Sequence, residues 1–320
     1  MRKINDLPDR VTPIVAEKYS QEYILSSLNS TPKAVRSISQ FLAGALGKGF
    51  RTKLLIACAM GEDGLVPSDA IYATAAVEIF HMATLVHDDI IDDAEIRRGL
   101  PSVQSQFGKK EAVVCGDFLL CVAIRIISHI NNTYPHLIDK FALAVERVCL
   151  GEMRQLSNNF NMDISFLEYM RIIHGKTAAL FSISAYGGGL LASEDEGEIK
   201  QLSKLGTYIG MTFQMQDDCK DYLLSDKDAL KPTKNDIVTG VVNLPLLLAF
   251  LKDPSLRSIA KEVAFDRELV KIVFDKVNIL GGVKASQNII DRYKLKINKI
   301  IAGLKNRVRA EALSQLIEAI

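Results

Sequence analysis

The sequence is poor in helix-breaking residues and has almost no net charge. Its 320 residues include only 20 Gly and 9 Pro, less than the roughly 12% that the two contribute to an average globular chain. This scarcity disfavours a turn-rich β-sandwich or barrel. The 39 basic and 38 acidic residues give a formal charge of +1, so no overall field attracts nucleic acid or an anionic membrane. Any electrostatic function must therefore be local.

Cysteine pairs and uninterrupted apolar runs are also missing. The five Cys are odd in number and include no CxxC pair, which is typical of reduced thiols in the cytosol rather than of a disulfide framework or a zinc site. The first residues show no signal peptide. Glu78 and His81 interrupt the apolar run over 70–86, and 241–251 is too short to cross a bilayer. We expect a soluble, cytoplasmic protein without a transmembrane segment.

The chain does contain helical periodicity. Apolar residues make up 48% of it, which excludes intrinsic disorder, and in the proline-free stretch 136–231 they recur at spacings of three and four. Ser68 and Asn243 are the expected N-caps, and no low-complexity linker divides the chain. We therefore expect one all-α domain over 1–320, with helices over 9–28, 33–45, 50–60, 67–93, 110–130, 135–160, 165–191, 195–224, 244–252, 264–279 and 284–306.

Two acidic motifs of the form DDxxD each end an apolar helical segment. On a helix the first and last aspartates share one face, and the second lies about 100° away. A solvated helix end explains a single motif of this kind equally well. Two copies indicate a hard dication such as Mg²⁺, which prefers carboxylate and phosphate oxygens. The motifs consist of Asp88, Asp89 and Asp92, and of Asp217, Asp218 and Asp221.

Basic residues follow the first motif closely, at Arg97 and Arg98. Metal ions on one side and guanidinium groups on the other suit the recognition of a diphosphate. One unit charge at about 4 Å contributes roughly 4 kcal/mol at an effective dielectric constant of about 20, whereas enzymes lower barriers by about 8–23 kcal/mol. Departure of a diphosphate from carbon therefore needs several positive charges.

These residues belong to an ordered series that resembles the trans-type polyprenyl diphosphate synthase family. The stretch from His81 to Gly99 is similar to the catalytic component of bacterial hexa- and heptaprenyl diphosphate synthases. The resemblance covers most of the chain, from about Leu46 to Leu248. Its motifs are Gly47-Lys48-x-x-Arg51, His81, Asp88-Asp89-x-x-Asp92, Arg97-Arg98-Gly99, Gly175-Lys176-Thr177, Phe213-Gln214-x-x-Asp217-Asp218-x-x-Asp221, and Lys231-Pro232 before Asp236 and Leu244-Pro245.

The resemblance implies a fold, a reaction and a set of site residues. The fold would be one bundle of antiparallel helices around a deep central cavity, of the isoprenoid synthase type. The enzyme would ionise an allylic diphosphate, add isopentenyl diphosphate to the cation and release a proton. It would act as a homodimer, or as a heteromer with a small regulatory chain. Several Mg²⁺ ions would be held by Asp88, Asp92 and Asp217, supported by Asp89, Asp218 and Asp221. The allylic substrate would bind Arg97, Lys176, Thr177, Gln214 and Lys231, and isopentenyl diphosphate would bind Lys48, Arg51, His81 and Arg98.

In this family the growing tail passes the helix that precedes the first DDxxD. Residues four and five positions before Asp88 then lie about 6–7.5 Å along the helix axis from the metal site. They are Thr84 and Ala83, neither of which is bulky. We therefore expect a product of about C30–C40. Phe80, further along the helix from the metal site, is expected to limit further growth of the tail.

Two departures from the family pattern keep other functions open. Gly49 and Thr52 replace a basic residue and the proline of the GGKRxRP pattern, and Val241 replaces the lysine of GKxTLP. One alternative is therefore a catalytic or binding subunit that is active only with a partner chain. Another is a terpene cyclase, whose second motif, NDxxSxxxE, has its nearest match at Asn235-Asp236 but meets Asn243 where glutamate is required.

Overall fold

The computed structural model describes residues 7–31, 36–44, 49–192, 195–223, 236–263, 266 and 268–318. These residues are mostly helical, with two short antiparallel two-stranded sheets, so the expected all-α class is confirmed. The described residues fall into two compact units. The first is drawn from Met1–Leu143, Leu180–Gly206 and Ile300–Ile320, and the second from Ala144–Ala179 and Thr207–Lys299. The expectation of one domain over 1–320 stays a prediction.

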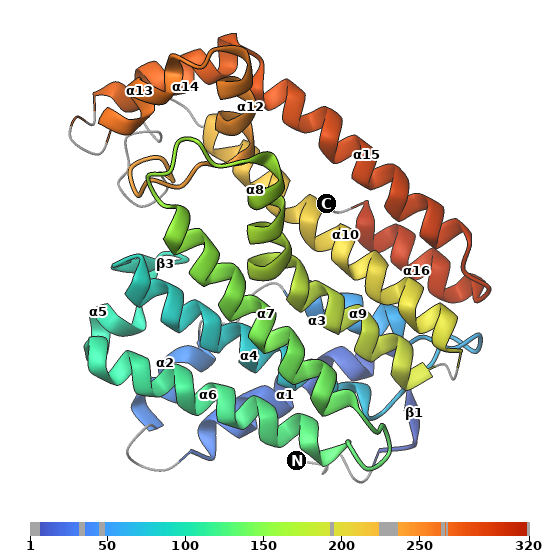
Figure 1. The fold of residues 1–320 in the computed structure, drawn as a ribbon. Helices are drawn as coiled ribbons and strands as arrows, with labels where there is room; N and C mark the ends of the chain where they lie inside the picture. Colours follow the sequence, from blue (N-terminus) through green and yellow to red (C-terminus); the bar gives the residue numbers. More distant parts are fainter. Residues whose placement is uncertain are drawn as a thin grey trace. The chain divides into compact units, whose positions relative to one another are not determined.

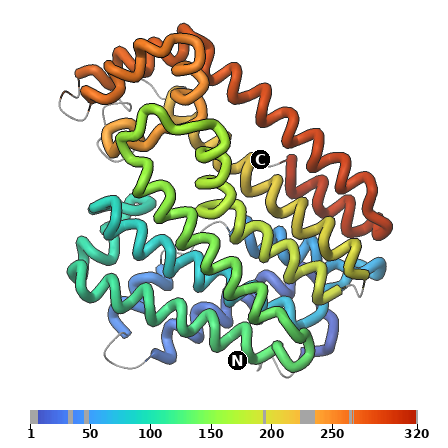
Figure 2. Tube along the Cα trace, in the orientation of Figure 1, coloured from blue at the N-terminus to red at the C-terminus, as the bar shows by residue number. Residues whose placement is uncertain are grey.

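The first unit is built around the long helix α4, Ala70–Ile91, which packs mainly against α6 and also against α1 and α3 (Figure 1). Figure 2 traces the chain from α4 through a small hairpin and α5, and then back along α6. The remaining elements of this unit are β1 (Arg10–Val11), α1 (Pro13–Asn29), α2 (Arg36–Ala43), α3 (Phe50–Cys58), β2 (Val66–Pro67), β3 (Ile96–Arg97), β4 (Leu100–Pro101), α5 (Val103–Phe107), α6 (Lys109–His129), most of α9 (Ala179–Ala192) and α16 (Arg307–Ile317).

Helix α4 is central because most of its side chains are buried and most of these are apolar. Ile71 and Ile79 are fully enclosed, and the ring of Phe80 meets that of Phe141 edge-on at 5.7 Å between centroids. By length and composition alone α4 and α6 could each cross a membrane. Core helices of soluble proteins pass the same test, and 67% of the apolar window of α4 is buried within the fold. The apolar character of α4 is therefore accounted for by the core.

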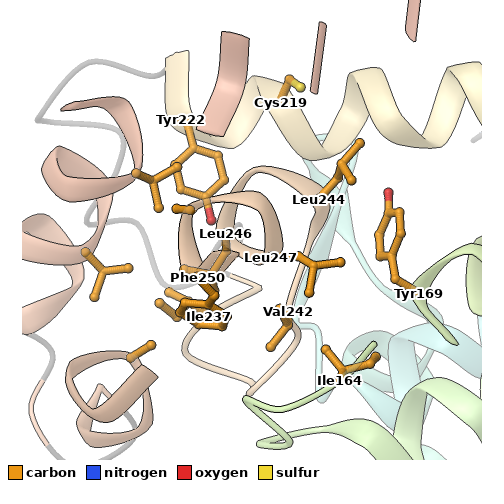
Figure 3. Close-up of a cluster of buried hydrophobic side chains, with 14 of the residues drawn as sticks. Ile164, Tyr169, Cys219, Tyr222, Ile237, Val242, Leu244, Leu246, Leu247 and Phe250 are labelled. Carbon is orange, nitrogen blue, oxygen red and sulfur yellow. The ribbon is translucent and has the colours of Figure 1, made fainter. Parts of the chain in front are cut away.

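The second unit has its own core beneath the C-terminal part of α10. Figure 3 shows side chains from α8, α10, η3 and α12 there, including Tyr169, Cys219, Tyr222 and Phe250. The chain also passes between the two units within α7 (Leu137–Asn158), α10 (Glu196–Lys220) and α15 (Gly282–Ala302). The other elements of the second unit are α8 (Phe166–Ile173), the π-helix η2 (His174–Ala178), the 3₁₀ helix η3 (Asp221–Leu223), α12 (Leu244–Lys252), α13 (Leu256–Glu262) and α14 (Leu269–Ile279).

Several expected helices differ from those observed. The helix expected over 165–191 contains the π-helical segment η2, and the one expected over 284–306 ends at Ala302, after which α16 begins at Arg307. Asn243 caps α12 as expected, because its side chain accepts a hydrogen bond from the N–H of Leu246. The prediction for Ser68 was wrong, since Asp69 is the N-cap residue of α4.

Candidate active site

The first acidic motif lies at the C-terminal end of α4, and its three aspartates differ in solvent exposure. Asp89 is only 2% exposed, whereas Asp88 is partly exposed and Asp92, the C-cap residue, faces solvent. This is the helical arrangement expected from the spacing, with Asp88 and Asp92 on one face. Carboxylates on the accessible face suit a metal bound together with phosphate oxygens, and the buried one does not.

Asp89 instead holds the chain that follows the motif. The Arg97 Nε donates to its carboxylate at 2.6 Å, and the Gln104 side chain donates to its backbone carbonyl at 2.6 Å. Burial raises the pKa of Asp89, and the hydrogen bond from Arg97 opposes that rise. Arg98 and Gly99 form the two-residue turn between β3 and β4 with positive φ angles of 52° and 80°, as tight hairpin turns require. This hairpin returns both arginines towards the end of α4.

Positive groups concentrate beside this motif within the first unit. Burial lowers the pKa of His81 well below its usual range, and Arg51, Arg98 and Arg97 lower it further by repulsion. Burial also lowers the pKa of Arg51 to about 10, with Glu78 opposing the shift. The Arg51 guanidinium lies 4.6 Å from the centre of the Phe181 ring, and its buried Nε has no hydrogen-bond partner. A bound anion would satisfy that donor and relieve the repulsion.

Thr52, which stands where the family pattern has proline, contributes to this arrangement. Its N–H and hydroxyl both donate to the Glu78 carboxylate, and proline could supply neither.

Gly49, the other replaced position near α3, is the N-cap residue of that helix and has a φ of 64°. Lys48 and Lys231, two of the expected substrate-binding residues, lie outside the described residues.

The second acidic motif, in the second unit, likewise has an accessible first aspartate and a buried second one. Asp217 is exposed and pairs with Lys220 at 3.2 Å, whereas Asp218 is only 5% exposed. The Asp218 carboxylate accepts hydrogen bonds from the Tyr169 hydroxyl at 2.6 Å, the Gln214 amide at 2.9 Å and the Leu244 N–H at 3.1 Å. Burial raises its pKa, and these donors oppose the rise. Asp218 thus ties α8 and α12 to α10.

The other expected residues of the second unit join this network through η2. The Thr177 hydroxyl donates to the Gln214 carbonyl at 2.6 Å, and Lys176 pairs with Glu152 of α7 at 2.9 Å. A Cβ atom on Gly175 would lie 2.7 Å from the Arg147 carbonyl oxygen, so only glycine permits α7 and η2 to approach this closely. The π-helical turn, a rare form found often at functional sites, therefore carries both Lys176 and Thr177.

Sequence reasoning missed several members of these networks. Tyr169, Glu78 and Glu152 belong to no recognised motif, and only their contacts identify them. Asp236 was considered as part of a cyclase motif, yet burial raises its pKa to about 8 and Asn243 donates a hydrogen bond to it at 3.4 Å. Asn243 is itself buried, caps α12 and accepts from Tyr222 at 2.8 Å. These structural roles disfavour a cyclase metal site at Asn243; Asn235 lies outside the described residues.

The three expected chain-length residues all lie on α4. Ala83 is 2% exposed, and Phe80 is equally enclosed against Phe141. The Thr84 hydroxyl donates to the His81 carbonyl oxygen at 2.8 Å, so its polar atom is satisfied within the helix. The assignment of these residues to chain length stays a prediction.

The donor set for a metal ion consists of exposed carboxylates. Among the described residues, no group of three His, Cys, Asp or Glu side chains lies close enough to hold a metal ion. Accessible aspartates spaced four apart in each motif nevertheless fit Mg²⁺, which is typically bound through one or two protein carboxylates while water and substrate phosphate complete its shell.

Comparison with known proteins gives a consistent result. A model of the Polyprenyl synthetase family matches residues 32–277. Heptaprenyl diphosphate synthase component 2 of Bacillus subtilis (strain 168) is 32% identical over 247 residues, covering 77% of this chain and 69% of that protein. Octaprenyl diphosphate synthase of Escherichia coli (strain K12) is 30% identical over 288 residues, covering 88% and 87% respectively. The crystal structure of heptaprenyl diphosphate synthase from Staphylococcus aureus superimposes with a TM-score of 0.88 at 25% identity, covering 96% of this chain and 98% of that one.

An all-α fold with accessible carboxylates in both acidic motifs and a basic cluster beside the first defines a protein suited to diphosphate chemistry. The chain belongs to the polyprenyl synthetase family. It is accordingly a prenyltransferase, and its fold is of the isoprenoid synthase type.

Proposed function

We propose that the chain extends an allylic diphosphate with isopentenyl diphosphate to form a linear polyprenyl diphosphate. The main support is the basic cluster of Arg51, His81, Arg97 and Arg98, with its unsatisfied Arg51 Nε, beside the first acidic motif. In this proposal Arg51, His81, Arg98 and Lys48 bind isopentenyl diphosphate. The neutral His81 donates a hydrogen bond without adding to the repulsion between the arginines.

The allylic diphosphate is assigned to Arg97, Lys176, Thr177, Gln214 and Lys231. Lys176 supplies a positive charge, and the Thr177–Gln214–Asp218 chain of hydrogen bonds fixes the orientation of the Gln214 amide. Asp88, Asp92 and Asp217 would hold Mg²⁺, while Asp89, Asp218 and Asp221 support them. When bound, Mg²⁺ would neutralise charge on the departing diphosphate. Attack of the isopentenyl double bond and loss of a proton then complete the reaction, without a protein nucleophile.

We assign a product of about C30–C40, because Ala83 and Thr84 are small. The names of the heptaprenyl and octaprenyl relatives support this range. Phe80 remains the residue that we propose to limit further growth of the tail. Mass analysis of the products formed from farnesyl diphosphate and labelled isopentenyl diphosphate measures the length directly.

We further propose that the enzyme works in the cytoplasm with a second chain, either another copy or a small regulatory subunit. Exposed apolar side chains on two helices support this association, namely Val113, Val114 and Ile124 on α6 and Met153 and Leu156 on α7. The name of the relative called component 2 supports a heteromer in particular.

One assay tests both the reaction and the need for a partner. The purified chain is incubated with Mg²⁺, farnesyl diphosphate and labelled isopentenyl diphosphate, with and without lysate of its host. Asp88→Ala and Asp217→Ala should each reduce turnover by at least about 100-fold, whereas Asp93→Ala, which removes an exposed partner of Lys109, should not. Activity only with lysate would indicate a heteromeric enzyme. A cyclised hydrocarbon, or full activity of either motif variant, would contradict the assignment.

A further inference from the structure

An open basic pocket, here called the cavity, lies at the surface of the second unit, apart from every residue assigned above to substrate or metal. It is formed by α7, α8, η2, α10 and α15, and its volume is about 430 Å³, within the usual range for small-molecule sites. Its polar wall consists of Arg147, Arg154, Arg171 and His174.

Positive charge is in excess on this wall. Glu168 is shared between two of the guanidinium groups, pairing with Arg154 at 2.7 Å and Arg171 at 3.2 Å. Within the part of the chain that the structure describes, Arg147 makes no ion pair. The pKa of His174, a residue exposed at the mouth of the cavity, is lowered first by partial burial and then by Arg147, which favours its neutral form. Guanidinium groups arranged in this way favour an anion with several oxygens, such as a phosphate or diphosphate.

The lining of the cavity also has an apolar part. It includes Met170, the buried Met211 and the ring of Tyr293. Tyr293 is held in place by an edge-on contact with Tyr208 at 5.5 Å and by the Lys296 ammonium 4.5 Å from its ring centre. An inorganic anion would leave this surface unused, whereas a ligand with a hydrocarbon tail would cover it.

The cavity is also lined by part of η2, the segment that carries two proposed substrate-binding residues. Gly175 lines the cavity and is followed directly by Lys176 and Thr177. A Cβ atom on Gly151 of α7 would clash with the Lys176 backbone nitrogen, so α7 and η2 are in tight contact. Lys176 also pairs with Glu152 on the same helix. Any shift of η2 against α7 would therefore move the Lys176 ammonium.

We propose that this cavity binds an amphiphilic anion, a prenyl diphosphate, with its headgroup on Arg147 and Arg171 and its tail against Met211 and Tyr293. Occupancy alters the affinity of the allylic site through η2. The binding step stands on the cavity alone, whereas its effect on the allylic substrate rests on the proposed function.

Binding is tested first without metal. Calorimetric titration with farnesyl thiodiphosphate in EDTA should show binding to the whole protein, with inorganic diphosphate binding more weakly because it has no tail. Arg147→Gln should weaken binding of the tailed probe by about tenfold, from the loss of a charged hydrogen bond. Arg292→Gln is the matched control: Arg292 is exposed beside Tyr293 but does not line the cavity. It should leave the affinity within about twofold of wild type.

The same variants then report on coupling. With Mg²⁺ and isopentenyl diphosphate held constant, Arg147→Gln should change the KM for farnesyl diphosphate or the inhibition at high farnesyl diphosphate, with kcat within about twofold of wild type. No metal-free binding, or binding unchanged in Arg147→Gln while its circular dichroism spectrum matches wild type, would overturn the proposal. Loss of metal-free binding in Asp217→Ala would also overturn it, by placing the probe at the catalytic site. A protein that binds the probe but transfers no prenyl group, even with host lysate added, would instead contradict the proposed function.

Discussion

The backbone N–H and the hydroxyl of Thr52 both donate to one carboxylate oxygen of Glu78, at 3.2 and 2.9 Å. The same carboxylate opposes the fall in the pKa of the neighbouring Arg51. Replacement of the family's proline by threonine thus adds two donors that fix Glu78 beside the basic cluster. Thr52, to which we assign no substrate contact, thus supports Arg51 through Glu78. Arg51 is one of the residues that we assign to isopentenyl diphosphate.

Glu78→Gln should therefore destabilise the protein with little change in side-chain shape. The amide still accepts from Thr52 but no longer offsets the Arg51 charge, so the free energy of unfolding should fall by about 1 kcal/mol. Urea denaturation measures the change. Glu146→Gln, at an exposed site on α7, is the control and should have no effect. An equal loss in both variants would show that Glu78 has no special role.

His81 should make stability depend on pH in the acid range. Its folded pKa lies below its unfolded value, so below about pH 6.5 the unfolded chain binds a proton that the folded protein excludes. Stability should then fall as pH decreases, by up to about 1.4 kcal/mol per pH unit from this residue. His81→Gln should show a smaller fall between pH 7 and pH 5 in parallel urea titrations. Identical pH profiles would refute the interpretation.

Asp217 and Asp218 should respond differently to the same substitution. Asp218→Asn replaces a carboxylate oxygen, which accepts hydrogen bonds, with an N–H₂ group that faces the donors around it. The free energy of unfolding should therefore fall by about 1–3 kcal/mol. Asp217→Asn, at an exposed position, should keep its stability and lose turnover. Thermal unfolding and the prenyl transfer assay on both variants separate these effects. A stable, fully active Asp218→Asn would contradict the network around Tyr169 and Leu244.

Ala83→Phe should shorten the product towards C15, because a ring at this position would fill the space that we assign to the tail. Ala83 is almost fully buried, so overpacking should also cost about 1–3 kcal/mol. Ala76→Phe, at another buried position on α4, controls for overpacking and should leave the product length unchanged. An unaltered product distribution in a folded Ala83→Phe variant would refute the assignment of Ala83 to chain length.

Local sequence signals predicted part of the fold and the grouping of site residues within each motif. The apolar run of α4 and the Asn243 cap were visible because both depend on neighbours in sequence. Helix α16 was missed, since distant contacts support it: Arg309 is 2% exposed and bonds to Glu198 at 2.7 Å and to the Met60 carbonyl at 3.1 Å. The π-helical turn at Lys176 likewise depends on the approach of Gly151 to Gly175, which lie far apart in the chain.

Helical spacing did predict that Asp89 would point away from Asp88, but it could not predict the partners. The bonds from Arg97 to Asp89 and from Tyr169 to Asp218 involve residues 8 and 49 positions away. Only the folded chain identifies the second aspartate of each motif as a structural carboxylate.

This division within each motif has a consequence for natural variants. With the metal ligands and the partner chain that we propose, loss of Asp88 or Asp217 would leave a correctly folded but inert protein at normal abundance, which would still bind the partner and thereby lower the activity of a wild-type copy. Loss of Asp89 or Asp218 would instead produce a chain that unfolds more often and is removed by cellular proteases. In the proposed assembly, only the first kind of change would inactivate complexes that also contain a wild-type copy.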